Sequence, residues 1–359
     1  METVKDQELP QIRGGQSGEP PSEPMVTLVV VMRNEEKHIG CCLESLFKND
    51  FPQSDYEVLV ADGMSEDSSR AIVQSKAERF PQLRLIENPG KIVPTGLNLA
   101  IRQARGRYIF ILGAHSEYPP NYISGCICEF ERTGATVVGG RLKTNPGADS
   151  LVARAIALIT QHRFGVGNSS FRLGGESRFV DTVPFGAYKR EVFEQVGLFN
   201  EELVRSQDFE FNARIRAAGG KIFMTSAIEI NYYNVATLRQ FARQGFSKGM
   251  FVGKSWVQSR ASFSWRHAAP LVLVLSLLLS LAVGYSSRLG LYFGMALFTT
   301  YLLAALGASA QIAARNGLAY FLISPIIFLA YHWSYGMGTL WSLLTAFFHT
   351  DSSASSAAR

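Results

Sequence analysis

The run VTLVVVM at residues 26–32 determines how the first half of this chain folds. It is continuous, apolar and rich in β-branched side chains, which is typical of a strand buried on both faces of a parallel sheet. The following stretch, EEKHIGCCLESLFKN at residues 35–49, carries its apolar side chains at helical spacing. A buried strand followed by an amphipathic helix begins a βαβ unit, so we expect an α/β domain whose strands are mostly parallel, with flanking helices.

The same alternation continues beyond this first unit. Residues 56–62, 83–88 and 106–113 have the composition of further strands, and helical stretches separate them. Beyond these the pattern becomes mixed, with strands and short helices. Ligands of such sheets bind beyond the carboxyl ends of the parallel strands. The sequence predicts a binding cleft at those ends, where it places Asn34, Glu35, Asp62, Gly63, Asn88, Gly113, Ala114 and His115.

A second region of different character follows. Hydrophobic residues make up 47% of the 359 residues and charged residues only 18%, a low share for a wholly soluble protein. Nearly all the charges precede about residue 267, and three almost uncharged stretches follow at 268–285, 289–310 and 318–348. Each is long enough to cross a bilayer as a helix. We therefore predict a soluble domain at residues 25–250 and about three transmembrane helices after it.

The segments that flank these regions favour a cytosolic location for the domain. Residues 1–24 are polar and rich in Pro, Gly and Glu, without the apolar core of a signal peptide, so we expect a disordered tail there. Residues 251–267 are a basic juxtamembrane segment that suits an anionic membrane surface. The positive-inside rule then places the domain on the cytosolic side of the cell membrane and residues 349–359, a second disordered tail, outside.

Two other classes of site are disfavoured. The net charge is +5, but no run of Lys and Arg and no nucleic-acid motif accompanies it. The four cysteines occur as Cys41-Cys42 and Cys126-x-Cys128, a spacing that suits neither an ordinary disulfide nor a zinc site. We expect these thiols to be buried, in a reducing compartment.

Five segments in a fixed order resemble a known enzyme family. The chain as a whole resembles the family 2 inverting glycosyltransferases with the GT-A fold, and most closely the membrane-bound glucosyltransferases of the succinoglycan-biosynthesis type. Those enzymes also place the catalytic domain first and a few membrane spans last. The segments that carry the resemblance lie at residues 29–46, 58–69, 94–123, 180–203 and 206–219.

The resemblance implies a nucleotide-sugar donor and suggests residues that hold it. Glu35, in the Asn34-Glu35 pair, would help to hold the nucleoside; alternatively it favours the start of its helix, where negative charge is stabilised. Asp62 would accept a hydrogen bond from the uracil N–H; alternatively Asp62 and Gly63 form a turn. Lys91 would approach the phosphates, or it is a solvated loop lysine.

The resemblance also places the catalytic base. Asp208, in SQDFEFNARI, matches the family's base, while Gln207 replaces the first acid of the usual Glu-Asp pair. One carboxylate is needed to take the proton of the acceptor hydroxyl as it attacks the anomeric carbon. Asp181 and Gly186 lie where donor and acceptor would meet. Asp181 either contacts the acceptor or positions its loop, and Gly186 leaves backbone open to close approach.

The stretch Gly113-Ala114-His115 stands where the broad family carries Asp-x-Asp. The last aspartate of that motif binds Mg²⁺ or Mn²⁺ on the donor diphosphate, so the resemblance implies a divalent cation and puts His115 at the metal-ligand position. Imidazole suits Mn²⁺ better than Mg²⁺, which prefers oxygen ligands. Three alternatives stay open: His115 binds a metal, a protonated His115 stabilises the diphosphate without one, or the site is degenerate. Glu117 is a weaker candidate ligand.

These features predict a membrane-anchored inverting glycosyltransferase. It would move one sugar, from a UDP-hexose, onto a hydroxyl of a lipid-linked saccharide such as a polyprenyl-linked acceptor in exopolysaccharide or glycan assembly. Arg243 and Lys248 would bind a lipid diphosphate or anchor the domain to the membrane. A processive synthase is disfavoured because its Gln-x-x-Arg-Trp motif is absent. A non-catalytic protein on the same scaffold is the other alternative, favoured by the lost aspartates.

Overall fold

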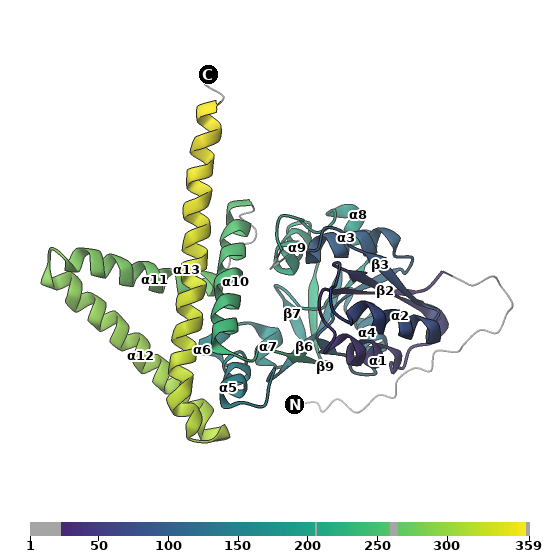
Figure 1. Cartoon of the computed structure of the whole chain (residues 1–359), viewed down its shortest axis with the longest axis horizontal. Helices are drawn as coiled ribbons and strands as arrows, with labels where there is room; N and C mark the ends of the chain where they lie inside the picture. Colours follow the sequence, from purple (N-terminus) through teal and green to yellow (C-terminus); the bar gives the residue numbers. More distant parts are fainter. Residues whose placement is uncertain (1–22, 205–206, 259–264, 357–359) are drawn as a thin grey trace.

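This computed structural model describes residues 23–204, 207–258 and 265–356. Figure 1 shows a sheet-and-helix domain joined to a group of long helices, with one helix, α10, between the two. The tail expected at residues 1–24 falls almost entirely outside the described residues. The four cysteines are free thiols; Cys42 and Cys126 are buried as expected, whereas Cys41 and Cys128 are exposed, so that expectation is wrong for these two.

A nine-stranded sheet organises the described part of the domain. Its strand order is β3-β2-β1-β4-β8-β6-β9-β5, and β7 pairs with β9. The strands are β1 (Val26–Met32), β2 (Tyr56–Asp62), β3 (Leu83–Glu87), β4 (Tyr108–Gly113), β5 (Ser116–Glu117), β6 (Val137–Asn145), β7 (Arg178–Val180), β8 (Ala187–Lys189) and β9 (Ile222–Tyr233).

The expectation of a mostly parallel sheet is correct in part. Strands β1 to β4 are parallel to one another, and the long strands β6 and β9 also pair in parallel. Strand β8 runs antiparallel between β4 and β6, and β5 and β7 run antiparallel to β9. The antiparallel strand β8 thus separates the parallel set β3-β2-β1-β4 from the parallel pair of β6 and β9, and the sheet is mixed.

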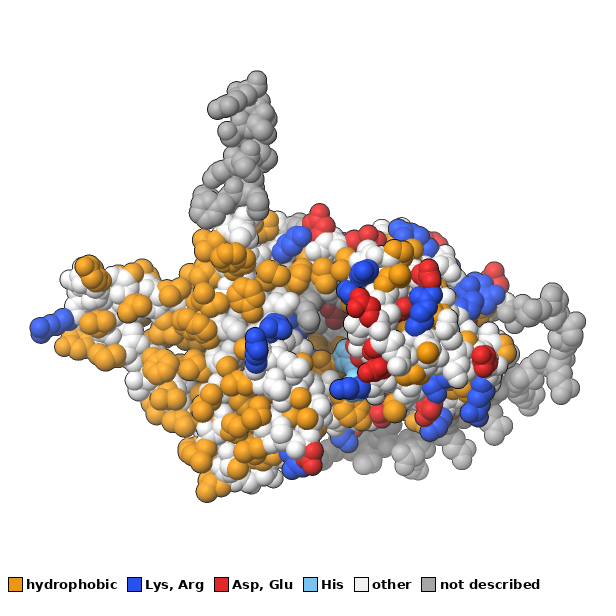
Figure 2. Space-filling view, viewed as in Figure 1, with side chains coloured by type: hydrophobic (Ala, Val, Ile, Leu, Met, Phe, Trp, Pro, Cys, Tyr) orange, Lys and Arg blue, Asp and Glu red, His pale blue; other side chains and the backbone are white. Residues whose placement is uncertain are grey.

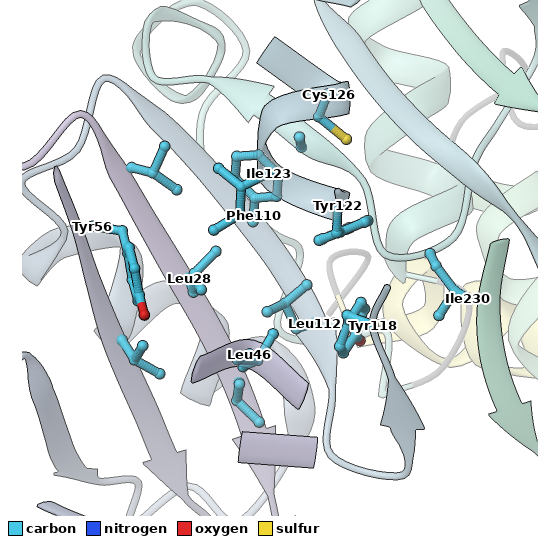
Figure 3. Packing of buried hydrophobic residues seen from close by; sticks show 14 of the residues in the cluster. Leu28, Leu46, Tyr56, Phe110, Leu112, Tyr118, Tyr122, Ile123, Cys126 and Ile230 are labelled. Atoms are coloured by element: carbon cyan, nitrogen blue, oxygen red, sulfur yellow. The ribbon is translucent and has the colours of Figure 1, made fainter. Parts of the chain in front are cut away.

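The apolar run of β1 faces two cores. Leu28 and Val30 point into one cluster and Val29 into another, and all three side chains are fully buried. Figure 3 shows the first cluster, in which Phe110, Leu112 and Tyr122 pack around Leu28. The flanking helices that cover the sheet are α1 (Ile39–Phe47), α2 (Ser69–Arg79), α3 (Val93–Gln103), α4 (Tyr122–Thr133), α8 (Glu191–Gln195) and α9 (Gln207–Ala217).

Three short helices between β6 and β7 have no counterpart in the sequence expectations. They are α5 (Leu151–Ile159), α6 (Arg163–Val166) and α7 (Ser170–Leu173). Ser150 caps α5 by accepting a hydrogen bond from the Ala153 N–H at 3.2 Å. Ile156 and Ile159 of α5 are fully buried in a cluster that also contains Phe241 and Phe328. The domain and the long helices thus share one hydrophobic core.

The long helices are α10 (Leu238–Gln258), α11 (Trp265–Gly284), α12 (Arg288–Asn316) and α13 (Ala319–Ser356). Two described stretches, His267–Gly284 and Arg288–Asn316, are long and apolar enough to cross a membrane. Their mean hydropathy is 2.1 and 1.7. In the apolar 18-residue window of each stretch, only 22% and 11% of the residues are buried inside the protein. Figure 2 shows that exposed apolar side chains gather over the long helices, on the left of the view.

Only two of the three expected spans are therefore supported by the helices. The third, at residues 318–348, stays a prediction, because α13 carries polar and aromatic residues such as His332 and packs along α10. The expected boundary after residue 250 falls inside α10, and residues 259–264 lie outside the described part. The tail expected at 349–359 is helical as far as Ser356, since no Gly or Pro interrupts α13 after Gly338.

Helices α10 and α13 lie in backbone contact. A Cβ atom added at Gly249 of α10 would stand 2.0 Å from the carbonyl oxygen of Tyr335 in α13. A Cβ added at Gly338 would stand 2.0 Å from the Phe246 carbonyl oxygen. Glycine at both positions allows an approach that any side chain would block, and it fixes α10, which follows the last strand, against the longest helix.

Candidate active site

The loops after β1 and β2 hold each other in place. Asn34 adopts a left-handed conformation with φ of 55°. Its N–H donates to Ser65 Oγ at 3.0 Å, and its Oδ1 accepts from the Glu66 N–H at 2.9 Å. Asp67 accepts in the same way from the Glu36 N–H at 3.1 Å. Asn34 is therefore a residue that shapes the rim of the site.

Asp62 is fully buried at the end of β2 and already has partners. Its carboxylate accepts from Ser65 Oγ at 2.6 Å and lies 3.4 Å from Arg70 Nη1. The adjacent Gly63 N–H donates to the Met32 carbonyl at 2.8 Å. The Asp62 carboxylate and the Gly63 N–H are therefore both engaged within the fold. Lys91 is exposed, with φ of 59°, in the turn after β3.

A phenyl ring stands beside Gly113. A Cβ atom added at Gly113 would lie 2.5 Å from Phe185 Cε1, closer than real atoms approach. Tyr118 Oη accepts from the Gly113 N–H at 2.7 Å, and Ala114 is buried. Phe185 is held with φ of 48°, and its carbonyl accepts from the Tyr122 hydroxyl. The space that a side chain at 113 would need is therefore filled, a role of Phe185 that the sequence alone did not reveal.

His115 and Glu35 come together at the edge of the sheet. His115 Nδ1 lies 3.4 Å from Glu35 Oε1, and the imidazole is 38% exposed. The imidazole of His115 and the ring of Tyr232 meet edge to face, with their centroids 5.4 Å apart. Glu117 faces another partner, since its Oε1 accepts from Tyr233 Oη at 3.2 Å. The pairing of Glu35 with His115 makes a charged group at the position where the sequence predicts the donor diphosphate.

Asp208 lies in the first turn of α9, next to a cavity of about 510 Å³. Its carboxylate accepts from the Phe209 N–H at 2.9 Å. Burial raises the pKa of Asp208 above its ordinary value, and the charges of Lys248 and Arg172 oppose that shift in pKa. A carboxylate with a raised pKa is a better proton acceptor at neutral pH, which is what a general base requires.

The cavity lies where the domain meets the long helices. Figure 2 shows a hollow between the charged domain and the apolar helices. Three cationic side chains line the cavity, from α6, α7 and α10. Arg172 also lies over the Tyr232 ring at 5.5 Å, the ring whose edge meets His115. The remaining walls are largely aromatic and apolar; the lining includes Arg163, Arg172, Lys248, Phe164, Phe171, Thr182, Phe209, His267, Pro270, Leu273, Tyr301, Tyr331, His332 and Tyr335.

The succession of strands and loops around this site matches a family model. Residues 27–197 match the model described as Glycosyl transferase family 2. This region is a glycosyltransferase family 2 domain. The match covers β1 to β8 and includes every donor-side residue predicted from the sequence, whereas Asp208 follows it in the chain.

Two curated relatives align with the family 2 domain and extend beyond it. A dolichyl N-acetyl-alpha-D-glucosaminyl phosphate 3-beta-D-2,3-diacetamido-2,3-dideoxy-beta-D-glucuronosyltransferase of Methanococcus voltae is 27% identical over 243 residues, 64% of this chain and 75% of that protein. The succinoglycan biosynthesis protein ExoA of Rhizobium meliloti is 28% identical over 246 residues, 68% of this chain and 74% of that protein. These relatives support a glycosyltransferase.

A solved structure has the same architecture as the family 2 domain and its helices. It is a mannosyltransferase from Pyrobaculum calidifontis in complex with GDP-Man and Mn²⁺, with a TM-score of 0.58 and 18% identity over 90% of this chain and 88% of that one. At this identity the likeness shows the fold alone. It confirms the GT-A fold, with a mixed sheet.

The family 2 domain offers two ligands to a divalent cation at its donor side. Glu35 and His115 supply a carboxylate oxygen and an imidazole nitrogen 3.4 Å apart, a donor set that suits Mn²⁺ better than Mg²⁺. Gly113 offers no ligand, and within residues 23–204, 207–258 and 265–356 no group of three His, Cys, Asp or Glu side chains surrounds a common point. The pair fits a cation whose other ligands come from a bound diphosphate and water.

The acceptor-side residues predicted from the sequence divide into two sets. Lys248 lines the cavity beside Asp208. Arg243 lies exposed on α10 and outside that lining. Asp181 is half-buried directly before Thr182, which does line the cavity. Gly186 lies against the sheet, with its carbonyl accepting from the Ile111 N–H at 3.0 Å. Arg163 and Arg172 were missed because short helices, which no sequence pattern indicated, bring them to the cavity.

Proposed function

We propose that this chain is a membrane-anchored inverting glycosyltransferase that moves one sugar from a nucleotide-sugar donor to a hydroxyl of a lipid-linked acceptor. One observation carries the proposal: Asp208 lines a cavity whose walls also carry three cationic side chains and apolar side chains of the long helices. Such a cavity suits an amphiphile with an anionic group and a hydrocarbon chain. A carboxylate at that point is placed to receive the proton of an acceptor hydroxyl.

The cations suggest that the acceptor carries a phosphate or diphosphate. Arg163, Arg172 and Lys248 lie around the same space as Asp208. Arginine binds phosphate oxygens through two parallel N–H groups, and lysine binds them as a point charge. An anionic group held by these side chains would bring the hydroxyl of a linked saccharide to Asp208. The relatives named above are similar in sequence, and one is named as acting on a dolichyl-linked sugar phosphate.

Asp208 would act as the general base of a single displacement. Its carboxylate takes the proton of the acceptor hydroxyl as that oxygen forms a bond to the anomeric carbon of the donor. The bond between the anomeric carbon and the diphosphate breaks at the same time, and its electron pair leaves with the diphosphate. The attack comes from the face opposite the leaving group, so the anomeric configuration inverts. The raised pKa of Asp208 favours the proton transfer.

The donor diphosphate would lie beside the Glu35–His115 pair. A divalent cation held by these two side chains would supply positive charge to the departing diphosphate. His115 meets the edge of Tyr232 and Arg172 covers the face of the same ring, which links the donor side to the cavity. We take the donor to be a UDP-hexose. Asp62 would reach the uracil only by exchanging its hydrogen bond with Ser65.

The domain would work at the cytosolic face of the cell membrane. The two long apolar helices leave most of their surface uncovered by protein, and an uncovered apolar helix of this length is stable in a bilayer. The orientation rests on the basic residues before α11, which favour the cytosolic side.

The test is sugar transfer by the full chain in detergent or membranes. UDP- and GDP-sugars would be supplied with a lipid-linked acceptor extract and with Mn²⁺, Mg²⁺ or EDTA, to the wild type and to Asp208→Asn. Transfer that Asp208→Asn abolishes supports the proposal. Transfer that the variant retains rules out Asp208 as the base.

A second candidate function is binding without catalysis. It is favoured by Gly113, where Phe185 fills the space of the carboxylate that the broad family carries. A protein of this kind would bind the nucleotide in a calorimeter yet transfer no sugar to any lipid fraction. Transfer of a single sugar would exclude it and also a processive polymerising activity.

A further inference from the structure

A second cavity, of about 440 Å³, lies among α11, α12 and α13. Figure 1 shows these three helices as the sides of a triangle, next to the end of the domain. We call this cavity the apolar groove. Every residue that lines it is hydrophobic: Leu277, Phe298, Ile326, Leu329, Ala330 and Trp333. A groove of this composition has no charged group with which to bind a polar ligand.

Two helices line both the apolar groove and the cavity beside Asp208. On α11, Leu273 lines the cavity and Leu277, four residues later, lines the groove. On α12, Tyr301 lines the cavity and Phe298, three residues earlier, lines the groove. Residues three or four apart lie on the same face of a helix. Both helices therefore carry the lining of one space into the other.

The boundary between the two spaces is formed by a hydrogen-bonded pair. Tyr301 Oη lies 2.9 Å from His332 Nδ1, and both residues line the cavity. Phe164 packs against both rings, at 5.6 and 5.3 Å between centroids. On α13 the two linings lie on different faces of the helix: Tyr331, His332 and Tyr335 line the cavity, whereas Ile326, Ala330 and Trp333 line the groove. A chain that runs from one space to the other would therefore follow α11 and α12, which line both.

We propose that the apolar groove binds the hydrocarbon chain of the lipid acceptor, in the part nearest its phosphate. The inference rests on the proposed function and adds the site of the chain. Its support is complementarity between two spaces that share the faces of α11 and α12: the cavity carries Arg163, Arg172 and Lys248, and the groove carries apolar side chains alone. A single-chain lipid phosphate has the same order of parts.

The groove would orient the acceptor rather than attract it from water. Lipid tails are as apolar as the groove, so a chain gains little hydrophobic free energy by entering it from the bilayer. What it gains is a fixed position, because packing on three helices holds the chain and therefore the phosphate attached to it. Holding a reactant in place in this way lowers the entropic cost of the transfer step.

The test is photolabelling of the full chain in phospholipid nanodiscs. The probe is a polyprenyl phosphate with a diazirine in its first isoprene unit. We expect labelling of the peptides that contain Leu277 or Phe298, which excess unlabelled polyprenyl phosphate prevents and inorganic phosphate or phosphatidic acid does not. Labelling that phosphatidic acid prevents equally well would mean a general lipid site and would overturn the inference, as would labelling that nothing prevents.

A pair of variants provides the matched control. Ala330→Trp fills the groove, whereas Leu303→Trp adds the same ring on α12 at a residue that is 64% exposed and lines neither space. We expect Ala330→Trp to reduce the labelling about tenfold, as for a pocket that rejects extra carbon atoms, and Leu303→Trp to leave it unchanged. Equal labelling of both variants contradicts the inference.

The two proposals fail in different ways. Labelling with the expected competition, together with no sugar transfer by the wild type, would support the groove as a lipid site and contradict the glycosyltransferase proposal. Transfer that depends on Asp208, together with labelling outside the groove peptides, would do the reverse.

Discussion

Gly113→Asp tests whether Phe185 occupies the space of the missing carboxylate. The new Cβ would lie 2.5 Å from Phe185 Cε1 and 2.8 Å from its Cζ. The phenyl ring cannot turn away freely, because its backbone has a φ of 48° and its carbonyl is bonded to the Tyr122 hydroxyl. Forcing extra atoms into a filled space costs about 1–3 kcal/mol, and we expect Gly113→Asp to lower the stability of the domain by that amount.

The assay is thermal unfolding of the purified chain in detergent, followed by intrinsic fluorescence. For a domain of this size each kcal/mol lowers the melting temperature by about 2–4 °C. Gly113→Ala is the matched control, since it adds the same Cβ without a charge. We expect it to lose most of the same stability, because the clash begins at that atom.

The decisive measurement is a double-mutant cycle with Phe185→Ala. Removing the ring alone destabilises the domain, since the ring packs near Tyr118 and Tyr232. In the Phe185→Ala background the aspartate introduced by Gly113→Asp finds free space, so the two losses should not add. We expect a favourable coupling of about 0.5–3 kcal/mol. Losses that add, or a Gly113→Asp variant as stable as the wild type, would refute the steric argument.

Three further outcomes follow from the described contacts. Asp208→Asn should abolish transfer yet melt at the same or a higher temperature at neutral pH, because burial raises the pKa of Asp208 in the folded state and its ionised form then costs stability. The higher stability of Asp208→Asn should shrink as the pH falls through the raised pKa, because wild-type Asp208 is then protonated. Wild-type sugar transfer should decline over the same pH range. Melting curves and transfer rates measured across pH test these two outcomes. Gly249→Ala should lower the melting temperature, since its Cβ would lie 2.0 Å from the Tyr335 carbonyl oxygen; Gly307→Ala in α12, where an added Cβ meets nothing within 4 Å, is the control. Lys248→Gln should raise KM for the lipid acceptor while nucleotide affinity, measured by calorimetry, is unchanged, and Arg243→Gln, on the same helix but outside the cavity, should change neither.

Local patterns were sufficient for the parallel half of the sheet. Strands β1 to β4 are continuous apolar runs with helices between them, and the expected boundaries agree with the structure to within two residues. Each of these units is specified by neighbours in the sequence. The same holds for the ends of the strands, where Glu35 and His115 were predicted to gather and lie 3.4 Å apart.

Contacts between distant residues could not be predicted in this way. Phe185 lies 72 residues after Gly113, and nothing in the composition of either segment indicates that the ring fills the space above the glycine. The helices between β6 and β7 likewise depend on distant partners: α5 and α6 pack against α10 and α13, and Phe171 of α7 packs against the cores of the sheet. Because those helices were not expected, neither were the two arginines that they bring to the cavity.

Arg172 connects the two sides of the candidate site, the Glu35–His115 pair and the cavity of Asp208. Its guanidinium lies over one face of Tyr232, whose edge meets His115, and it also lines the cavity of Asp208. Tyr232 is near the end of β9, and the residues that follow that strand lead into α10. Since α10 is fixed to α13 through glycine contacts, the ring that separates the two sides is held by the same elements that attach the domain to its apolar helices. A lipid acceptor that settles among those helices would therefore meet Asp208 and the donor in a geometry that the fold has already set.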